Sequence, residues 1–292
     1  MRRSLLFLPG NTPNMLINGG ALRADAVILD CEDSVAPGEK DAARILVRNA
    51  LQTLDFGCET VVRINFPESE FGEKDLETLV PCSPDILMPP KSATAEGIRR
   101  LDEKITELEK KNGLPVGGIK LIPLIETALG VENAYAIATA SKRVVGIFLG
   151  GEDLSADLRC RRTKSGEEIL YARGRMVMAA RAAGVEVYDT PFTDAYDDEG
   201  LLADAKFAKD LGFSGKVAVA PRHVTAINEI FSPTKAEIAY AGEVMEAIAE
   251  AERLGKGAVS LHGKMVDPPI VERARQILEA ADAMGKRGGF GG

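Results

Sequence analysis

The 292-residue chain contains no tryptophan and only two histidines, His223 and His262. Neither histidine lies in an H-E-x-x-H motif, and no G-x-S-x-G motif is present to pair with one. A histidine-rich zinc site and a Ser-His-Asp hydrolase therefore lack support. We expect both histidines to be surface side chains or to be held by hydrogen bonds.

Cysteines are few and scattered, and long apolar runs are absent. No two of the four cysteines have C-x-x-C spacing (Cys31, Cys58, Cys82 and Cys160). We interpret them as reduced thiols of a cytoplasmic protein. The first apolar stretch, Leu5–Leu8, is too short for a signal peptide. No run approaches the ~20 apolar residues that span a bilayer, so we do not expect a membrane partner.

The chain also lacks an excess of basic residues. It has 36 Lys and Arg against 44 Asp and Glu, a net charge of −8. This balance argues against nucleic acid as a partner, because phosphate neutralisation requires a basic face. The G-x-G-x-x-G and G-x-x-x-x-G-K-[ST] motifs are missing too, which leaves dinucleotide and P-loop sites without support.

Short apolar runs that alternate with amphipathic stretches dominate what is present. The eight runs are Leu5–Leu8, Ala26–Leu29, Thr60–Ile64, Asp85–Met88, Lys120–Leu124, Val144–Leu149, Val185–Tyr188 and Lys216–Ala220. Continuous apolar runs are typical of buried parallel strands, and strand–helix alternation predicts an α/β fold. We predict a (β/α)₈ TIM barrel over residues 1–231 and favour it over a doubly wound open sheet. Polar, glycine and proline residues follow nearly every run, as at a barrel's active face.

Residues 232–292 depart from this pattern and predict a C-terminal helical extension. Thr234 and Glu237 have the spacing of a capping box, and a second helix is expected from Pro268. The apolar stripe of the first helix is Ile238, Ala241, Val244, Met245 and Ile248. This stripe requires a partner, either the barrel of the same chain or a neighbouring subunit. We expect the terminal Gly-Gly-Phe-Gly-Gly segment, residues 288–292, to be frayed.

Carboxylates gather directly after the predicted strands. They are Asp30, Glu32, Asp33, Glu126, Glu152 and Asp153. Parallel strands of a barrel end at one mouth, so these groups converge, and a hard divalent cation such as Mg²⁺ would relieve their repulsion. Arg63 ends a strand among them and suits a substrate carboxylate. The alternative is a structural network of ion pairs and helix caps.

Asp267 precedes Pro268 and a helical pattern. Its ordinary role is to cap that helix, with Pro268 at the first helical position. It also lies on a turn, however, and turns can present catalytic groups.

Several segments, in order along the chain, resemble the citrate lyase β-subunit family. They are Arg3–Asn11, Ala26–Val35, Val62–Asn65, Ile125–Val131, Gly151–Leu154 and Gly263–Asp267. The wider superfamily includes malyl-, citramalyl- and β-methylmalyl-CoA lyases and malate synthase. The resemblance implies a Mg²⁺-dependent barrel that forms trimers or multiples of trimers.

The resemblance also assigns roles to individual residues. It implies that Glu126 and Asp153 are the metal ligands and that Arg63 binds the oxaloacetate-like substrate. Asp267 would be the catalytic acid or base, reaching across from a neighbouring subunit. Two acids, Asp30 and Glu32, would lie beside the metal. We expect Glu152 and the backbone N–H groups of residues 150–153 to contact substrate.

The implied activity is cleavage of a citryl thioester to oxaloacetate and an acetyl thioester. The thioester would be carried by an acyl carrier protein loaded by a transferase subunit, or by CoA. One alternative is a stand-alone malyl-CoA or citramalyl-CoA lyase. The other is a barrel without catalysis that acts as a scaffold.

Overall fold

The computed structural model describes residues 1–254 and 259–288. Contacts divide the chain into two units, residues 2–229 and residues 230–292 together with Met1. This division lies close to the predicted boundary at residues 231 and 232. The predicted frayed tail lies, from residue 289 onward, outside the described residues.

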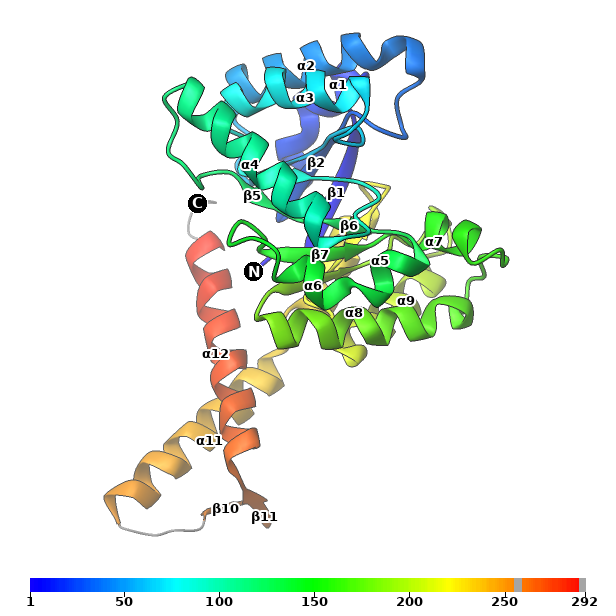
Figure 1. Cartoon of the computed structure of the whole chain (residues 1–292). Helices are drawn as coiled ribbons and strands as arrows, with labels where there is room; N and C mark the ends of the chain where they lie inside the picture. Colours follow the sequence, from blue (N-terminus) through cyan, green and yellow to red (C-terminus); the bar gives the residue numbers. More distant parts are fainter. Residues whose placement is uncertain (255–258, 289–292) are drawn as a thin grey trace. The chain divides into compact units, whose positions relative to one another are not determined.

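The larger unit is a parallel sheet covered by helices (Figure 1). Its strands are β1 (Ser4–Pro9), β2 (Ala26–Asp30), β3 (Glu59–Arg63), β4 (Ile86–Met88), β5 (Lys120–Leu121), β6 (Leu124–Ile125), β7 (Gly146–Leu149), β8 (Glu186–Asp189) and β9 (Gly215–Ala218). Every apolar run predicted as a strand overlaps one or two of these strands. The predicted and observed ends differ by at most two residues. The α/β class is therefore confirmed.

Helices connect the strands. They are α1 (Pro13–Asn18), α2 (Lys40–Thr53), α3 (Glu70–Leu79), α4 (Ala95–Lys111), α5 (Ala128–Glu132), α6 (Ala134–Ala138), α7 (Gly151–Asp157), α8 (Leu170–Ala183), α9 (Asp198–Leu211) and α10 (His223–Phe231). Thr94 caps α4 and Thr127 caps α5, each accepting a backbone N–H three residues on. These caps fix where the chain turns from each loop into its helix.

The sheet is TIM-barrel-like, but the expected closed ring of eight strands is wrong. Nine strands pair in the order β5-β4-β3-β2-β1-β9-β8-β7-β6. The predicted strand over Lys120–Leu124 is split into β5 and β6 by Ile122 and Pro123. Proline has no N–H to donate to a ladder, which accounts for the break. An isolated bridge from Leu121 to Val144 lies beside it.

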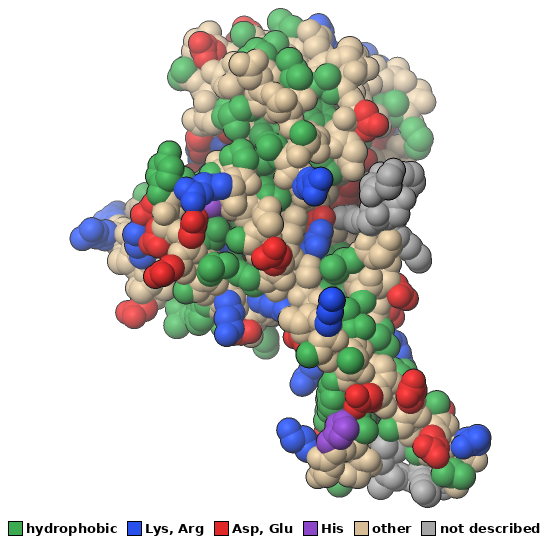
Figure 2. Space-filling view, turned by 180° about the vertical axis from the view of Figure 1, so that it is seen from behind, with side chains coloured by type: hydrophobic (Ala, Val, Ile, Leu, Met, Phe, Trp, Pro, Cys, Tyr) green, Lys and Arg blue, Asp and Glu red, His purple; other side chains and the backbone are tan. Residues whose placement is uncertain are grey.

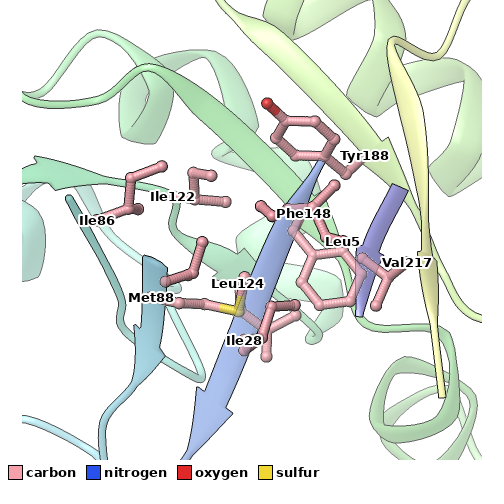
Figure 3. Packing of buried hydrophobic residues seen from close by; sticks show 11 residues of the cluster. Leu5, Ile28, Ile86, Met88, Ile122, Leu124, Phe148, Tyr188 and Val217 are labelled. Carbon is pink, nitrogen blue, oxygen red and sulfur yellow. The ribbon is translucent and has the colours of Figure 1, made fainter. Parts of the chain in front are cut away.

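The interior of the curled sheet is filled by side chains from nearly every strand (Figure 3). They include Leu5, Ile28, Ile86, Met88, Ile122, Leu124, Phe148, Tyr188 and Val217. Strands β4, β6 and β7 are buried along their whole length, which explains their uninterrupted apolar sequences. This rigid core leaves function to the residues that follow the strands.

The smaller unit contains α11 (Lys235–Arg253), the hairpin of β10 (Val259–Leu261) with β11 (Lys264–Val266), and α12 (Pro268–Gly288). The capping box is confirmed, because Thr234 and Glu237 bond each other's backbone N–H groups. The stripe residues Ala241, Val244, Met245 and Ile248 pack within this unit. Their partners include Val266, Ile270, Ala274 and Ile277. These four residues therefore pack against α12 of the same unit, a partner that the prediction of a barrel or a neighbouring subunit did not include.

Charges of both signs are interspersed over the face drawn in Figure 2. Among the described residues, no helix is both long and apolar enough to cross a membrane. No disulfide joins the four cysteines in the part of the chain that the structure describes.

Candidate functional site

A cavity of about 450 Å³ opens at the carboxyl ends of the strands. Its lining includes most of the predicted site residues, namely Asp30, Arg63, Glu126, Glu152 and Asp153. Asp30 ends β2, Arg63 ends β3 and Glu126 directly follows β6. Asp153 lies in α7, the helix after β7. The parallel sheet thus brings together groups that are up to 123 positions apart in the chain (Asp30 to Asp153).

Arg63 is held by a bidentate ion pair with Asp30. Its Nε lies 2.7 Å from Asp30 Oδ1 and its Nη2 lies 2.6 Å from Asp30 Oδ2. Strand register places the two residues opposite each other. The guanidinium group also lies 4.6 Å from the centre of the Phe7 ring. This pair lowers the pKa of Asp30, so the carboxylate stays charged and fixes the arginine.

The remaining nitrogen of Arg63 faces two further acids. Nη1 lies 3.2 Å from Glu32 Oε2 and 3.6 Å from Asp33 Oδ2. Glu32 also lies 3.5 Å from the Nζ of Lys91. Burial raises the pKa of Glu32 to about 7 despite these cations. The part of the guanidinium that a substrate could reach is therefore Nη1.

Glu126 is a buried carboxylate with too little positive charge around it. The residue is 4% exposed, and its Oε1 accepts the backbone N–H of Lys91 at 2.7 Å. Burial, together with the nearby charge of Asp153, raises its pKa to about 8. Gly150 packs so closely that a Cβ there would lie 2.8 Å from Glu126 Oε2. The glycine thus leaves room for the carboxylate.

The carboxylate of Asp153 forms no hydrogen bond or ion pair with the part of the chain that the structure describes. Glu152 beside it is exposed and lies 3.4 Å from Arg162 Nε. The four backbone N–H groups predicted to bind substrate are not all available. Gly150 donates to the carbonyl of Ile125 and Gly151 to Thr190 Oγ1. Of the four, the N–H groups of Glu152 and Asp153 remain available to a substrate.

Glu126 and Asp153 fit a Mg²⁺ ion. Both line one cavity, the charge of Asp153 lies close enough to act on Glu126, and neither has an ion pair with the described residues. Within residues 1–254 and 259–288, no three His, Cys, Asp or Glu side chains form a metal cage. Two carboxylates with open positions for water and substrate oxygens are the arrangement that Mg²⁺ prefers.

Asp267 belongs to the smaller unit and caps α12. Its Oδ1 accepts the backbone N–H of Ile270 at 3.2 Å, and Pro268 begins the helix. The predicted cap is confirmed. The side chain is exposed in this chain, and its catalytic role stays a prediction.

Two residues of the site were missed by the sequence reasoning. Lys91 follows β4 with a left-handed backbone, φ +51°, and orients Glu126. Thr190 follows β8 and orients Gly151. Both residues follow strands, β4 and β8, as the predicted acids do. The prediction covered only acids and arginine at these positions.

The two histidines differ in their surroundings. His262 is exposed and lies 2.6 Å from Glu243, as expected. His223 is 1% exposed and therefore not a surface side chain, and its ring interacts with the backbone of Ala195. Burial lowers the pKa of His223, which favours the neutral ring.

Comparison with known proteins places these residues in a family context. The model of the HpcH/HpaI aldolase/citrate lyase family matches residues 3–221. The chain is 44% identical to citrate lyase subunit beta of Haemophilus influenzae, covering 96% of this chain and 97% of that protein. It is 35% identical to mitochondrial citramalyl-CoA lyase of Rattus norvegicus, covering 97% of this chain and 87% of that protein.

Solved structures of similar proteins point to the same family. The protein CitE from Mycobacterium tuberculosis, in complex with magnesium, acetoacetate and coenzyme A, has a TM-score of 0.78 at 31% identity, covering 96% of this chain and 98% of that chain. The citrate lyase beta subunit from M. tuberculosis, complexed with oxaloacetate and magnesium, has a TM-score of 0.68 at 32% identity, covering 80% and 97%. The chain belongs to the HpcH/HpaI aldolase/citrate lyase family.

Proposed function

We propose that this chain is the lyase subunit of a citrate lyase. With Mg²⁺ held by Glu126 and Asp153, it cleaves a citryl thioester to oxaloacetate and an acetyl thioester. The observation that carries the proposal is the pair of uncompensated carboxylates on one cavity wall, near a guanidinium fixed by Asp30. The likeness to citrate lyase beta subunits, one of them complexed with oxaloacetate and magnesium, supports the same substrate.

The reaction breaks the bond between the hydroxyl-bearing carbon and the methylene carbon next to the thioester. The bonding electrons pass to the methylene carbon and delocalise into the thioester carbonyl. The hydroxyl loses its proton and becomes the ketone of oxaloacetate, and the methylene gains a proton. When bound, Mg²⁺ supplies a Lewis acid at the hydroxyl oxygen and the adjacent carboxylate.

Arg63 binds and orients the dicarboxylate end of the substrate. Its Nη1 is the donor that faces acids other than Asp30, so a substrate carboxylate displaces the weaker contacts to Glu32 and Asp33. Asp30 acts by holding Arg63 in place, and Glu32 balances the charge of Arg63 until the substrate binds. Asp267, contributed by a neighbouring subunit, delivers the proton to the methylene carbon.

The proposed assembly is a trimer or a multiple of it, together with other citrate lyase subunits. An acyl carrier protein carries the citryl group, and a transferase subunit loads it. In the assay, CoA takes the place of the acyl carrier protein. The proposed location is the cytoplasm.

The test is cleavage of citryl-CoA by the purified chain, with oxaloacetate measured through malate dehydrogenase and NADH. We expect turnover that EDTA abolishes and Mg²⁺ restores. Glu126→Gln should lose about 10²-fold or more, because a ligand of the catalytic metal is removed. Glu96→Gln, at an exposed helical glutamate, is the matched control and should retain full activity.

Three outcomes would contradict the proposal. Cleavage of malyl-CoA or citramalyl-CoA in place of citryl-CoA would indicate a stand-alone CoA lyase. Activity unchanged by EDTA would remove the metal from the reaction. A chain that cleaves neither citryl-CoA nor the citryl carrier protein would support the alternative of a scaffold without catalysis.

A further inference from the structure

Thr190 lies in the cavity wall without a role in the chemistry described above. It directly follows β8, is 1% exposed and borders the same cavity as Asp153. Resting on the proposed function, we propose that Thr190 is the positioning residue for the metal ligand Asp153. It would act through the backbone of Gly151, at the start of α7.

The link between Thr190 and α7 is a single buried hydrogen bond. The Gly151 N–H donates to Thr190 Oγ1 at 3.0 Å. The two residues are in tight contact, since a Cβ on Gly151 would lie 2.7 Å from that oxygen. Asp153 is two residues further along the same helix and has no side-chain partner among the described residues. Its carboxylate is therefore placed only by the backbone of α7, which Thr190 holds.

Thr190 is itself fixed by a buried cluster of four charges beneath the cavity. Lys216 of β9 donates from Nζ to the Thr190 carbonyl at 2.6 Å and to Asp189 Oδ2 at 2.5 Å. Arg173 of α8 binds Asp189 with two contacts of 2.9 Å. Asp204 completes the cluster, 2.6 Å from Lys216 and 2.7 Å from Arg173.

This cluster explains why the threonine can act as an anchor. Arg173, Asp189 and Lys216 are 0% exposed, and two positive and two negative charges balance within the cluster. Buried and paired charges of this kind resist movement, because breaking one pair leaves a charge unpaired. The backbone at residues 189 and 190 is therefore held firmly. Groups that orient metal ligands typically change metal affinity 10–100-fold when removed.

The test measures Mg²⁺ affinity by isothermal titration calorimetry on the full chain. Thr190→Val removes the acceptor oxygen at nearly constant volume, and Thr190→Ser keeps it. We expect Thr190→Val to weaken Mg²⁺ binding about tenfold and Thr190→Ser to bind like the wild type. Thermal unfolding without metal reports whether each variant folds. If the valine variant does not fold, Thr190→Ala removes the same oxygen without added bulk.

The outcomes separate this inference from the proposed function. Wild-type protein that does not bind Mg²⁺ would contradict the proposed function itself, and Asp153→Asn supplies the reference for loss of a ligand. Wild-type binding together with a Thr190→Val affinity within twofold of it would overturn only the role of Thr190. A change in KM for citryl-CoA with unchanged Mg²⁺ affinity would also overturn it, since it would indicate direct substrate contact.

Discussion

Glu126 is protonated at neutral pH in the absence of a cation, because burial raises its pKa from 4.5 to about 8. A Mg²⁺ ion must then displace a proton to bind. We expect Mg²⁺ affinity to rise about tenfold per pH unit below pH 8 and to level off above it. Calorimetry in two buffers of different ionisation enthalpy would measure the proton released. Affinity that is flat between pH 6 and 8 would contradict this.

The same raised pKa affects stability without metal. The folded state binds the Glu126 proton more tightly than the unfolded state, so the apoprotein loses stability as pH rises from about 4.5 to about 8. Glu126→Gln should remove this loss and stabilise the apoprotein at pH 9 by about 1–3 kcal/mol. Urea unfolding at pH 5 and pH 9 with EDTA checks the expectation. A pH dependence in the variant as large as that of the wild type would exclude Glu126 as the source.

Arg63 has a structural role as well as the proposed chemical one. Arg63→Ala leaves Asp30, which is 1% exposed, without its bidentate partner. We expect a loss of about 3–5 kcal/mol in the free energy of unfolding, along with loss of turnover. The double variant Asp30→Asn/Arg63→Gln removes both charges and should recover most of the stability but no activity. Equal stability of the single variant and wild type in urea would refute the pairing.

The sequence predicted the acids of the site better than the groups that orient them. Glu126 and Asp153 were identified because they follow strands, and parallel strands end at one edge. Lys91 and Thr190 follow strands too, yet they act through a backbone N–H and a hydroxyl oxygen. Such roles depend on a left-handed turn and on tertiary contacts, which residue type alone does not predict.

At the scale of elements, the capping box of α11 gives a direct prediction. Thr234→Ala removes the side-chain acceptor of the Glu237 N–H and should cost about 1 kcal/mol locally. The effect should appear as faster hydrogen exchange in the first turn of α11. Thr234→Ser retains the hydroxyl and is the control. Unchanged exchange in the alanine variant would mean that packing against α12 alone fixes the helix start.

Elements were predictable where local signals and packing agree. The capping box and the eight apolar runs required no tertiary information. The interruption at Pro123 was visible in the sequence, but its consequence, a sheet of nine strands without a closed ring, depends on the pairing of the neighbouring strands. The packing of α11 on α12 was not predicted, because the match of Ile270, Ala274 and Ile277 to the stripe of α11 depends on the tertiary fold.

At the scale of the whole molecule, the proposed catalytic set is divided between two units. Glu126, Asp153 and Arg63 belong to residues 2–229, and Asp267 belongs to residues 230–292. With the stripe of α11 covered by α12, an unpartnered face no longer argues for a neighbouring subunit. The case for Asp267 acting across subunits therefore rests on the family resemblance and needs its own test.

Complementation between two inactive variants supplies that test. Glu126→Gln removes a proposed metal ligand. Asp267→Asn keeps the cap, because asparagine also caps helices, and removes the proposed acid. Each protein alone should be inactive. If Asp267 serves the neighbouring subunit, oligomers reassembled from an equal mixture pair an intact Glu126 with an intact Asp267 at about a quarter of the sites. The mixture should then show about a quarter of wild-type turnover of citryl-CoA, and no recovery after verified subunit exchange would place Asp267 in its own chain's site or outside the reaction.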